Sequence, residues 1–167
     1  MYVYLVRHAI AFNPDPTNWP DDRDRPLTPQ GEKRFAAAAR GLRELVPTLE
    51  VVLSSPLVRA WQTAEILQRN AGWPAPVRLD ELEPGRPPAD VVAGLQPHAS
   101  AQSMALVGHE PSLHELASYL LAGDPATVRM VMRKGGVACL QFQEAVGPGA
   151  ADLDWLVRPR ILRAIGG

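Results

Sequence analysis

Side chains suited to handling phosphate follow several short apolar runs of this chain. Arg7 and His8 follow the first run, and Arg59 comes soon after the second. Glu81 stands among carboxylates after the third run, and His109 follows the fourth. Arginine donates two directed hydrogen bonds to phosphate oxygens. A neutral imidazole can attack phosphorus, and a carboxylic acid can protonate a leaving group. Together these residue types indicate phosphoryl transfer.

Each of these side chains has a specific chemical use and an ordinary alternative. The charge of Arg7 disfavours protonation of the neighbouring imidazole, so we expect His8 to be neutral at physiological pH and available as a nucleophile. Arg59 leans back toward the N-terminus of its expected helix, where free N–H groups favour an anion. His109 can donate to a phosphoryl oxygen. The ordinary alternatives are that His8 is a surface histidine, that Arg59 is a solvated helical arginine, and that His109 is a histidine with a structural hydrogen bond.

A metal site is not expected. His109, Glu110 and His114 superficially resemble the helical zinc motif of metalloproteases. That motif needs histidines four residues apart on one helix face, whereas these are five apart with a proline between them. Cys139 is the single cysteine and lies in an apolar strand-like run, which excludes a disulfide framework and a cysteine-rich metal site. We therefore predict no metal and no cofactor.

The elements that must position these residues follow from apolar runs and helix-start signals. Strand signals cover residues 2–6, 51–53, 77–79 and 104–107, and a Pro- and Asp-rich loop covers residues 13–26. Cap and proline pairs predict where the main helices begin. The expected helices run from Pro29 (capped by Thr28, with Gly31 weakening the first turn) to about Leu45, from the Ser55-Pro56 pair to about Asn70, weakly over residues 90–95, and from Pro111 to just before Gly123.

The alternation of strands and helices predicts an α/β fold. We expect a three-layer α/β/α sandwich with a mostly parallel sheet. Residues 137–142 and 153–157 read as strands without a helix between them, so they are expected to add an antiparallel edge. Ligands of such sheets bind outside the carboxyl ends of the strands. This placement would bring the phosphate-handling residues together.

Composition limits the partners and the organisation. With 167 residues, of which 46% are hydrophobic, the chain is expected to form a single domain over residues 1–167. A net charge of -1 gives no general electrostatic case for nucleic acid or an acidic membrane surface. The sequence shows neither a basic leader nor an apolar run of membrane-spanning length, so we expect a cytoplasmic protein. The oligomeric state is left open.

Three segments carry a family resemblance. Leu5-Val6-Arg7-His8-Ala9 resembles the Arg-His-Gly signature of the histidine phosphatase superfamily. The segments 54–64 and 107–111 look like its second and third signatures, in the right order. The short length and the segments 25–28 and 133–135 most resemble the compact bacterial SixA branch, named for a phosphohistidine phosphatase.

The resemblance implies roles for individual residues. His8 would become phosphorylated, while Arg7, Arg59 and His109 would clamp the phosphoryl oxygens. Glu81 matches the acid of the family's Leu-x-Glu segment and would protonate the leaving group. Ala9 departs from the pattern, because the family usually has glycine there. Its methyl group is expected to narrow the phosphate pocket or to demand a different backbone angle.

These observations predict a metal-independent phosphohydrolase that works through a phosphohistidine intermediate. Because no sizeable insertion roofs the pocket, we expect a shallow, open site. Such a site favours a phosphate displayed on another protein, and the resemblance points to phosphohistidine as the preferred group. A phosphatase for small phosphate esters is the alternative enzyme. A phosphate-binding module without turnover is the alternative outside enzymes, with Ala9 as its main sequence support.

Overall fold

The strands of the chain form one mixed sheet of six strands in the computed structural model, which describes residues 1–167. The strand order is β3-β2-β4-β1-β5-β6. Strands β1 to β4 pair in parallel, whereas β5 runs antiparallel to β1 and β6 antiparallel to β5. The strands are β1 (Tyr2–Arg7), β2 (Val51–Ser54), β3 (Pro76–Arg78), β4 (Ser103–Gly108), β5 (Val137–Phe142) and β6 (Ala151–Val157). The predicted parallel sheet with an antiparallel edge is confirmed.

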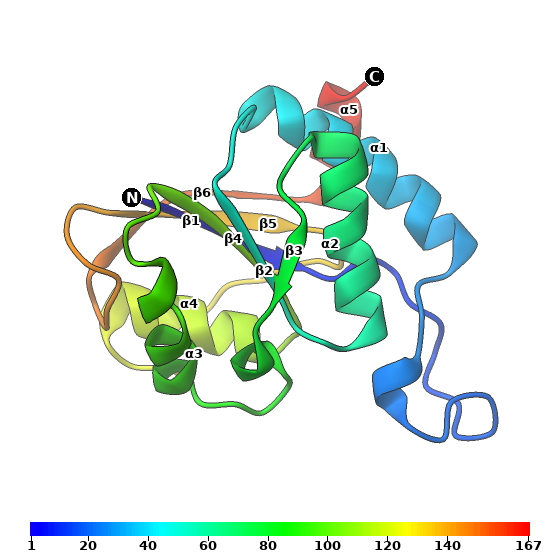
Figure 1. Cartoon of the computed structure of the whole chain (residues 1–167), viewed down its shortest axis with the longest axis horizontal. Helices are drawn as coiled ribbons and strands as arrows, with labels where there is room; N and C mark the ends of the chain where they lie inside the picture. Colours follow the sequence, from blue (N-terminus) through cyan, green and yellow to red (C-terminus); the bar gives the residue numbers. More distant parts are fainter.

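Helices cover both faces of this sheet, as Figure 1 shows. Helices α1, α2 and α5 pack on one face, and α3 and α4 pack on the other. The side chains of β1 alternate between these two layers, with Tyr4 and Val6 facing the first and Val3 and Leu5 the second. None of the helices combines the length and apolar character needed to cross a membrane. The helices are α1 (Pro29–Leu45), α2 (Val58–Ala71), α3 (Pro88–Gly94), α4 (Ser112–Ala122) and α5 (Pro159–Ile165).

Two sequence-based expectations about the helices need correction. Helix α2 begins at Val58 rather than at the Ser55-Pro56 pair, and no side chain caps it. The Ser55 hydroxyl is instead bonded to the Nε2 atom of His109 at 2.9 Å. Helix α5 was not expected and begins at Pro159, almost directly after β6. Both differences arise because tertiary contacts, rather than local signals, decide these segments.

The register of the central strands holds their carboxyl ends level. Arg7 of β1 pairs with Gly108 of β4, and Ser54 of β2 pairs with Val107 of β4. The ladder extends one step further, because the His8 N–H donates to the Gly108 carbonyl at 3.0 Å and the Ser55 N–H to the Val107 carbonyl at 3.0 Å. The residues that follow these three strands therefore emerge side by side.

Helix α1 approaches the segment after β1 very closely. Its cap residue Thr28 accepts a hydrogen bond from the Gly31 N–H at 2.9 Å, and the Thr28 N–H donates to the Ile10 carbonyl at 3.0 Å. A Cβ atom at Gly31 would overlap that carbonyl oxygen. Gly31 is thus more than a weak point of the first turn, since the missing side chain lets α1 contact the segment that follows His8.

Replacing Gly31 with alanine is expected to lower the free energy of unfolding by about 1 to 3 kcal/mol, because the Ile10 backbone must move. Without a steric overlap the substitution would instead raise the free energy of unfolding, because alanine is the better helix former by about 1 kcal/mol. Urea denaturation of wild type and Gly31→Ala measures the change. Gly147→Ala is the control, because its new Cβ atom meets nothing within 4 Å. A Gly31→Ala variant at least as stable as wild type would show that this contact is not tight.

Candidate active site

Four of the predicted site residues come together at the level ends of β1, β2 and β4. The His8 and His109 rings lie with their centroids 5.2 Å apart. His8, Arg59 and His109 are only 7%, 5% and 2% exposed. Arg7 is the last residue of β1 and directly precedes His8. The structure therefore gathers two imidazoles and two guanidinium groups, as the sequence predicts.

The hydrogen bonding of His8 determines which ring nitrogen carries the hydrogen. Its Nδ1 atom lies 2.7 Å from the Ala9 carbonyl oxygen, which can only accept, so Nδ1 carries the hydrogen. In the neutral ring Nε2 then holds a free lone pair. Burial lowers the pKa of His8 to about 3, and the charges of Arg59 and Arg7 act in the same direction. Burial, rather than the charge of Arg7, is thus the main reason for a neutral His8 ring.

His109 is held by a hydrogen bond to Ser55. Its Nε2 atom lies 2.9 Å from the Ser55 hydroxyl oxygen, which also accepts a hydrogen bond from the Leu57 N–H at 3.4 Å. A hydroxyl can both donate and accept, so this contact is compatible with either tautomer of the neutral His109 ring. Nδ1 is buried and has no partner. Burial lowers the pKa of His109 to about 2, so the ring is neutral.

Each arginine of the site is anchored at one end of its guanidinium group. Arg7 donates from Nη1 to the Met132 carbonyl at 2.6 Å, and Arg59 donates from Nη1 to the Asp22 carbonyl at 2.7 Å. The Nε atoms of both arginines are buried without a partner. Buried polar groups are rarely left unpaired, so these two Nε–H donors form a set that an anion would satisfy. A phosphoryl group, with several acceptor oxygens, fits this set.

Ala9 adopts an ordinary backbone conformation. Positive φ angles occur only at glycines in this structure, so the backbone of Ala9 lies outside the left-handed region that favours glycine. Its methyl group packs in the core between the sheet and helices α1 and α2. The Ala9 N–H donates to the Thr63 hydroxyl at 3.0 Å, and this hydroxyl donates to the Arg59 carbonyl at 2.7 Å. Thr63 thus ties the segment after the nucleophile to the helix that carries Arg59.

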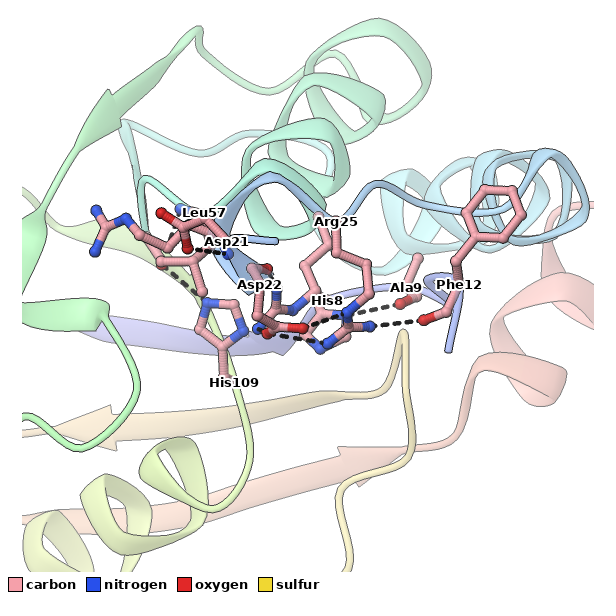
Figure 2. A network of polar contacts seen from close by, with 11 residues as sticks. His8, Ala9, Phe12, Asp21, Asp22, Arg25, Leu57 and His109 are labelled. Carbon is pink, nitrogen blue, oxygen red and sulfur yellow. Dashed lines mark hydrogen bonds and ion pairs between the residues drawn. The ribbon is translucent and has the colours of Figure 1, made fainter. Parts of the chain in front are cut away.

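The loop of residues 13–26 lies over the site, which corrects the expectation of a shallow, open pocket. The Asp22 carboxylate contacts Arg59 Nη2 at 3.1 Å and Arg25 Nε at 2.6 Å. Arg25 also donates to the Phe12 carbonyl at 2.7 Å, and Figure 2 shows this network together with His8. The hydrogen bond from Arg25 lowers the pKa of Asp22, and the charge of Arg59 lowers it further. Sequence reasoning missed Asp22, because nothing local distinguishes it from Asp21 and Asp24.

Glu81 is not brought to this cluster. It lies in a short 3-10 helix, Asp80–Leu82, and its carboxylate packs against Gly94 of α3. There it lines a separate surface hollow together with Arg86 and Asp90. Asp22 and Glu110 are the carboxylates closer to the two arginines. Burial raises the pKa of Glu110, and the positive charge of Arg7 acts in the opposite direction. No carboxylic acid is hydrogen-bonded to His8 or His109.

Comparisons with known proteins agree with this geometry. Residues 3–85 match the model of the histidine phosphatase superfamily (branch 1). An uncharacterised protein of Picosynechococcus is 36% identical over 143 residues, which cover 84% of this chain and 85% of that protein. An uncharacterised protein of Mycobacterium tuberculosis is 32% identical over 93% of this chain and all of its own length.

The fold comparison points to one branch of that superfamily. The structure of the protein histidine phosphatase SixA complexed with tungstate superposes with a TM-score of 0.83 and 27% sequence identity. The match covers 97% of this chain and 99% of that one. The chain belongs to the histidine phosphatase superfamily, in its SixA-like branch, and is a phosphatase by that membership.

Proposed function

We propose that this phosphatase transfers a phosphoryl group to Nε2 of His8 and then to water, and that its substrate is a phosphohistidine on another protein. The observation that carries the proposal is the free Nε2 lone pair of His8 beside the buried, unpartnered Nε–H groups of Arg7 and Arg59. A nucleophile and a set of oxyanion donors in a water-poor site are what phosphoryl transfer requires.

The proposed reaction has two balanced steps. In the first, the His8 lone pair forms the N–P bond while the bond from phosphorus to the leaving atom breaks, and the leaving atom takes up a proton. In the second, a water oxygen bonds to phosphorus, the N–P bond breaks, and inorganic phosphate leaves neutral His8 behind. Arg7, Arg59 and His109 stabilise the charge on the equatorial oxygens in both steps. Protein groups supply this stabilisation in the scheme, so no metal ion is needed.

No carboxylic acid is hydrogen-bonded to His8, and this bears on the substrate. An alcohol leaves as a strongly basic alkoxide and therefore needs a general acid in place. A phosphohistidine whose other ring nitrogen is protonated leaves as neutral imidazole, and the pKa of the imidazolium ion is only about 6.5, so this leaving group needs less help from a general acid. The position of Glu81, away from the cluster, thus favours phosphohistidine over a small phosphate ester. The similarity to a structure named as a protein histidine phosphatase supports the same choice.

Replacing His8 with alanine is expected to lower hydrolysis by more than about 10³-fold, since no other group on the chain offers a free nucleophile at this position. The assay compares release of phosphate from a phosphohistidine protein and from p-nitrophenyl phosphate, with His98→Ala as the matched control. We expect a higher kcat/KM for the phosphohistidine protein and no loss of activity in excess EDTA.

The other results of that assay point to different functions. Equal hydrolysis by wild type and His8→Ala would remove His8 as the nucleophile. A preference for p-nitrophenyl phosphate would favour the small-ester phosphatase. Phosphate binding without turnover of any substrate would favour the binding module, and inactivation by EDTA would contradict the metal-free scheme.

Asp22 places a negative charge on Arg59, where the phosphoryl group would bind. Asp22→Asn removes this charge and keeps a carbonyl oxygen for the arginine. We expect inorganic phosphate to bind about fivefold more tightly, because two unit charges 4 Å apart interact by about 1 kcal/mol in water. Calorimetric titration with phosphate measures the change, and Asp24→Asn in the same loop is the control. Weaker binding by Asp22→Asn would instead mean that the carboxylate holds Arg59 in place for phosphate.

Two buried neutral histidines make the folded protein less stable in acid. The folded-state pKa values of His8 and His109, about 3 and about 2, lie below the unfolded value near 6.5. Their contribution to stability is therefore complete above pH 6.5 and is lost as the pH falls toward the folded pKa values, because only the unfolded chain takes up the protons. Between pH 7 and pH 5 each histidine is expected to account for about 2 kcal/mol.

Urea denaturation at pH 7 and pH 5 in phosphate-free buffer tests this dependence. The His8→Asn/His109→Asn variant should lose less stability on acidification than wild type, while carboxylates common to both proteins cancel in the comparison. The same loss in both proteins would show that the two imidazoles are protonated in the folded state.

A further inference from the structure

A second cationic surface adjoins the active site. A pocket of about 280 Å³ opens between the first turns of α1, the loop of residues 133–135 and the start of α5. Its lining includes Ala9 and Ile10, the residues directly after His8. The cations that line it, called here the anion pocket, are Arg34, Arg133, Lys134, Arg158, Arg160 and Arg163.

The six cations of the anion pocket have no carboxylate partners. None of them takes part in an ion pair, and no aspartate or glutamate lines the pocket. Other arginines near the site are paired, such as Arg23 with Glu83 and Arg25 with Asp22. The whole chain carries a net charge of only -1, so this surplus of positive charge is local. A local field of this kind attracts an oppositely charged partner.

Hydrogen bonds join the anion pocket to the catalytic segment. The N–H of Gly135, a pocket residue, lies 3.0 Å from the Arg7 carbonyl and 3.1 Å from the His8 carbonyl. Lys134 precedes it and is one of the cations that hold the pKa of His8 low. A group bound in the pocket would therefore lie next to a phosphoryl group on His8, on the side of α1 and α5.

We propose that the anion pocket binds acidic side chains that flank the phosphorylated residue of a protein substrate. The proposal rests on the proposed function, because it adds a recognition surface to the same reaction. One further phosphate would engage two or three cations, whereas a segment with several carboxylates can use all six.

Binding of labelled peptides to the full chain tests the proposal. Two peptides carry a non-hydrolysable phosphohistidine analogue, flanked in one by glutamates and in the other by glutamines. At low ionic strength we expect the glutamate peptide to bind wild type about tenfold more tightly, since three exposed ion pairs of a few tenths to 1 kcal/mol give this ratio. The variant Arg158→Gln/Arg160→Gln/Arg163→Gln should lose most of the preference, and added salt should weaken it.

A charge-matched control separates the pocket from the overall charge. Arg40→Gln/Arg43→Gln/Arg69→Gln removes three positive charges around a different surface hollow and should keep the preference. Equal binding of both peptides to wild type, or equal loss of preference in both variants, would overturn the proposal. If pyrophosphate binding depends on the pocket arginines and the peptides show no preference, the ligand of the pocket is a small polyanion rather than a protein segment.

The proposed function is measured separately in the same series. Hydrolysis of a phosphohistidine peptide by wild type reports turnover, whereas the binding ratio needs none. If wild type discriminates between the two peptides but hydrolyses neither, the anion pocket is supported and the proposed reaction is contradicted. If wild type hydrolyses phosphohistidine without discriminating between the peptides, the reaction is supported and the anion pocket is contradicted.

Discussion

The parallel register of β1, β2 and β4 places three strand ends at one level, and the site exists only because of this alignment. His8 and Ser55 extend the ladder by bonding to the carbonyls of Gly108 and Val107. A slip of one residue in β1 would exchange its two faces and turn Val3 and Leu5 toward the wrong layer. Packing of both faces therefore fixes the register, and the register in turn fixes the distance between the two site histidines.

Burial then sets the electrostatics of the site. His8, Arg59 and His109 are almost fully enclosed, so the imidazoles are neutral and the guanidinium groups lack much of their hydration. The hydrogen bond to the Ala9 carbonyl chooses the tautomer of His8, and the hydrogen bond to Ser55 fixes the orientation of the His109 ring. As a result, the His8 ring keeps a lone pair on Nε2. Such a preorganised site is costly to bury but needs little rearrangement during phosphoryl transfer.

Sequence patterns could predict the residues whose position depends on a nearby strand end. Arg7, His8 and His109 follow strands with clear apolar signals, and Arg59 lies in the first turn of a helix, so their convergence could be inferred from the fold class. Asp22 could not be inferred in this way, because its contact with Arg59 depends on the path of a long loop.

Where local signals compete with tertiary contacts, the sequence alone misleads. The Ser55-Pro56 pair has the form of a helix start, but the Ser55 hydroxyl bonds to His109 instead. Glu81 follows its strand as expected, yet a turn of 3-10 helix carries its carboxylate to Gly94. Thr63 lies inside a segment that resembles a family signature, and only the fold shows that it bonds to the Ala9 N–H.

The contact between Asp22 and Arg59 makes the loop a tethered competitor of the phosphoryl group. Because the carboxylate belongs to the same chain, its effective concentration at Arg59 stays constant however dilute the enzyme is. A weakly held anion is displaced whenever the loop returns, whereas a substrate with contacts outside the site can keep the loop away. Under the proposed function, inorganic phosphate, which has no such contacts, would therefore be held less tightly than a phosphorylated protein, and the loop would weaken inhibition of the enzyme by its own product.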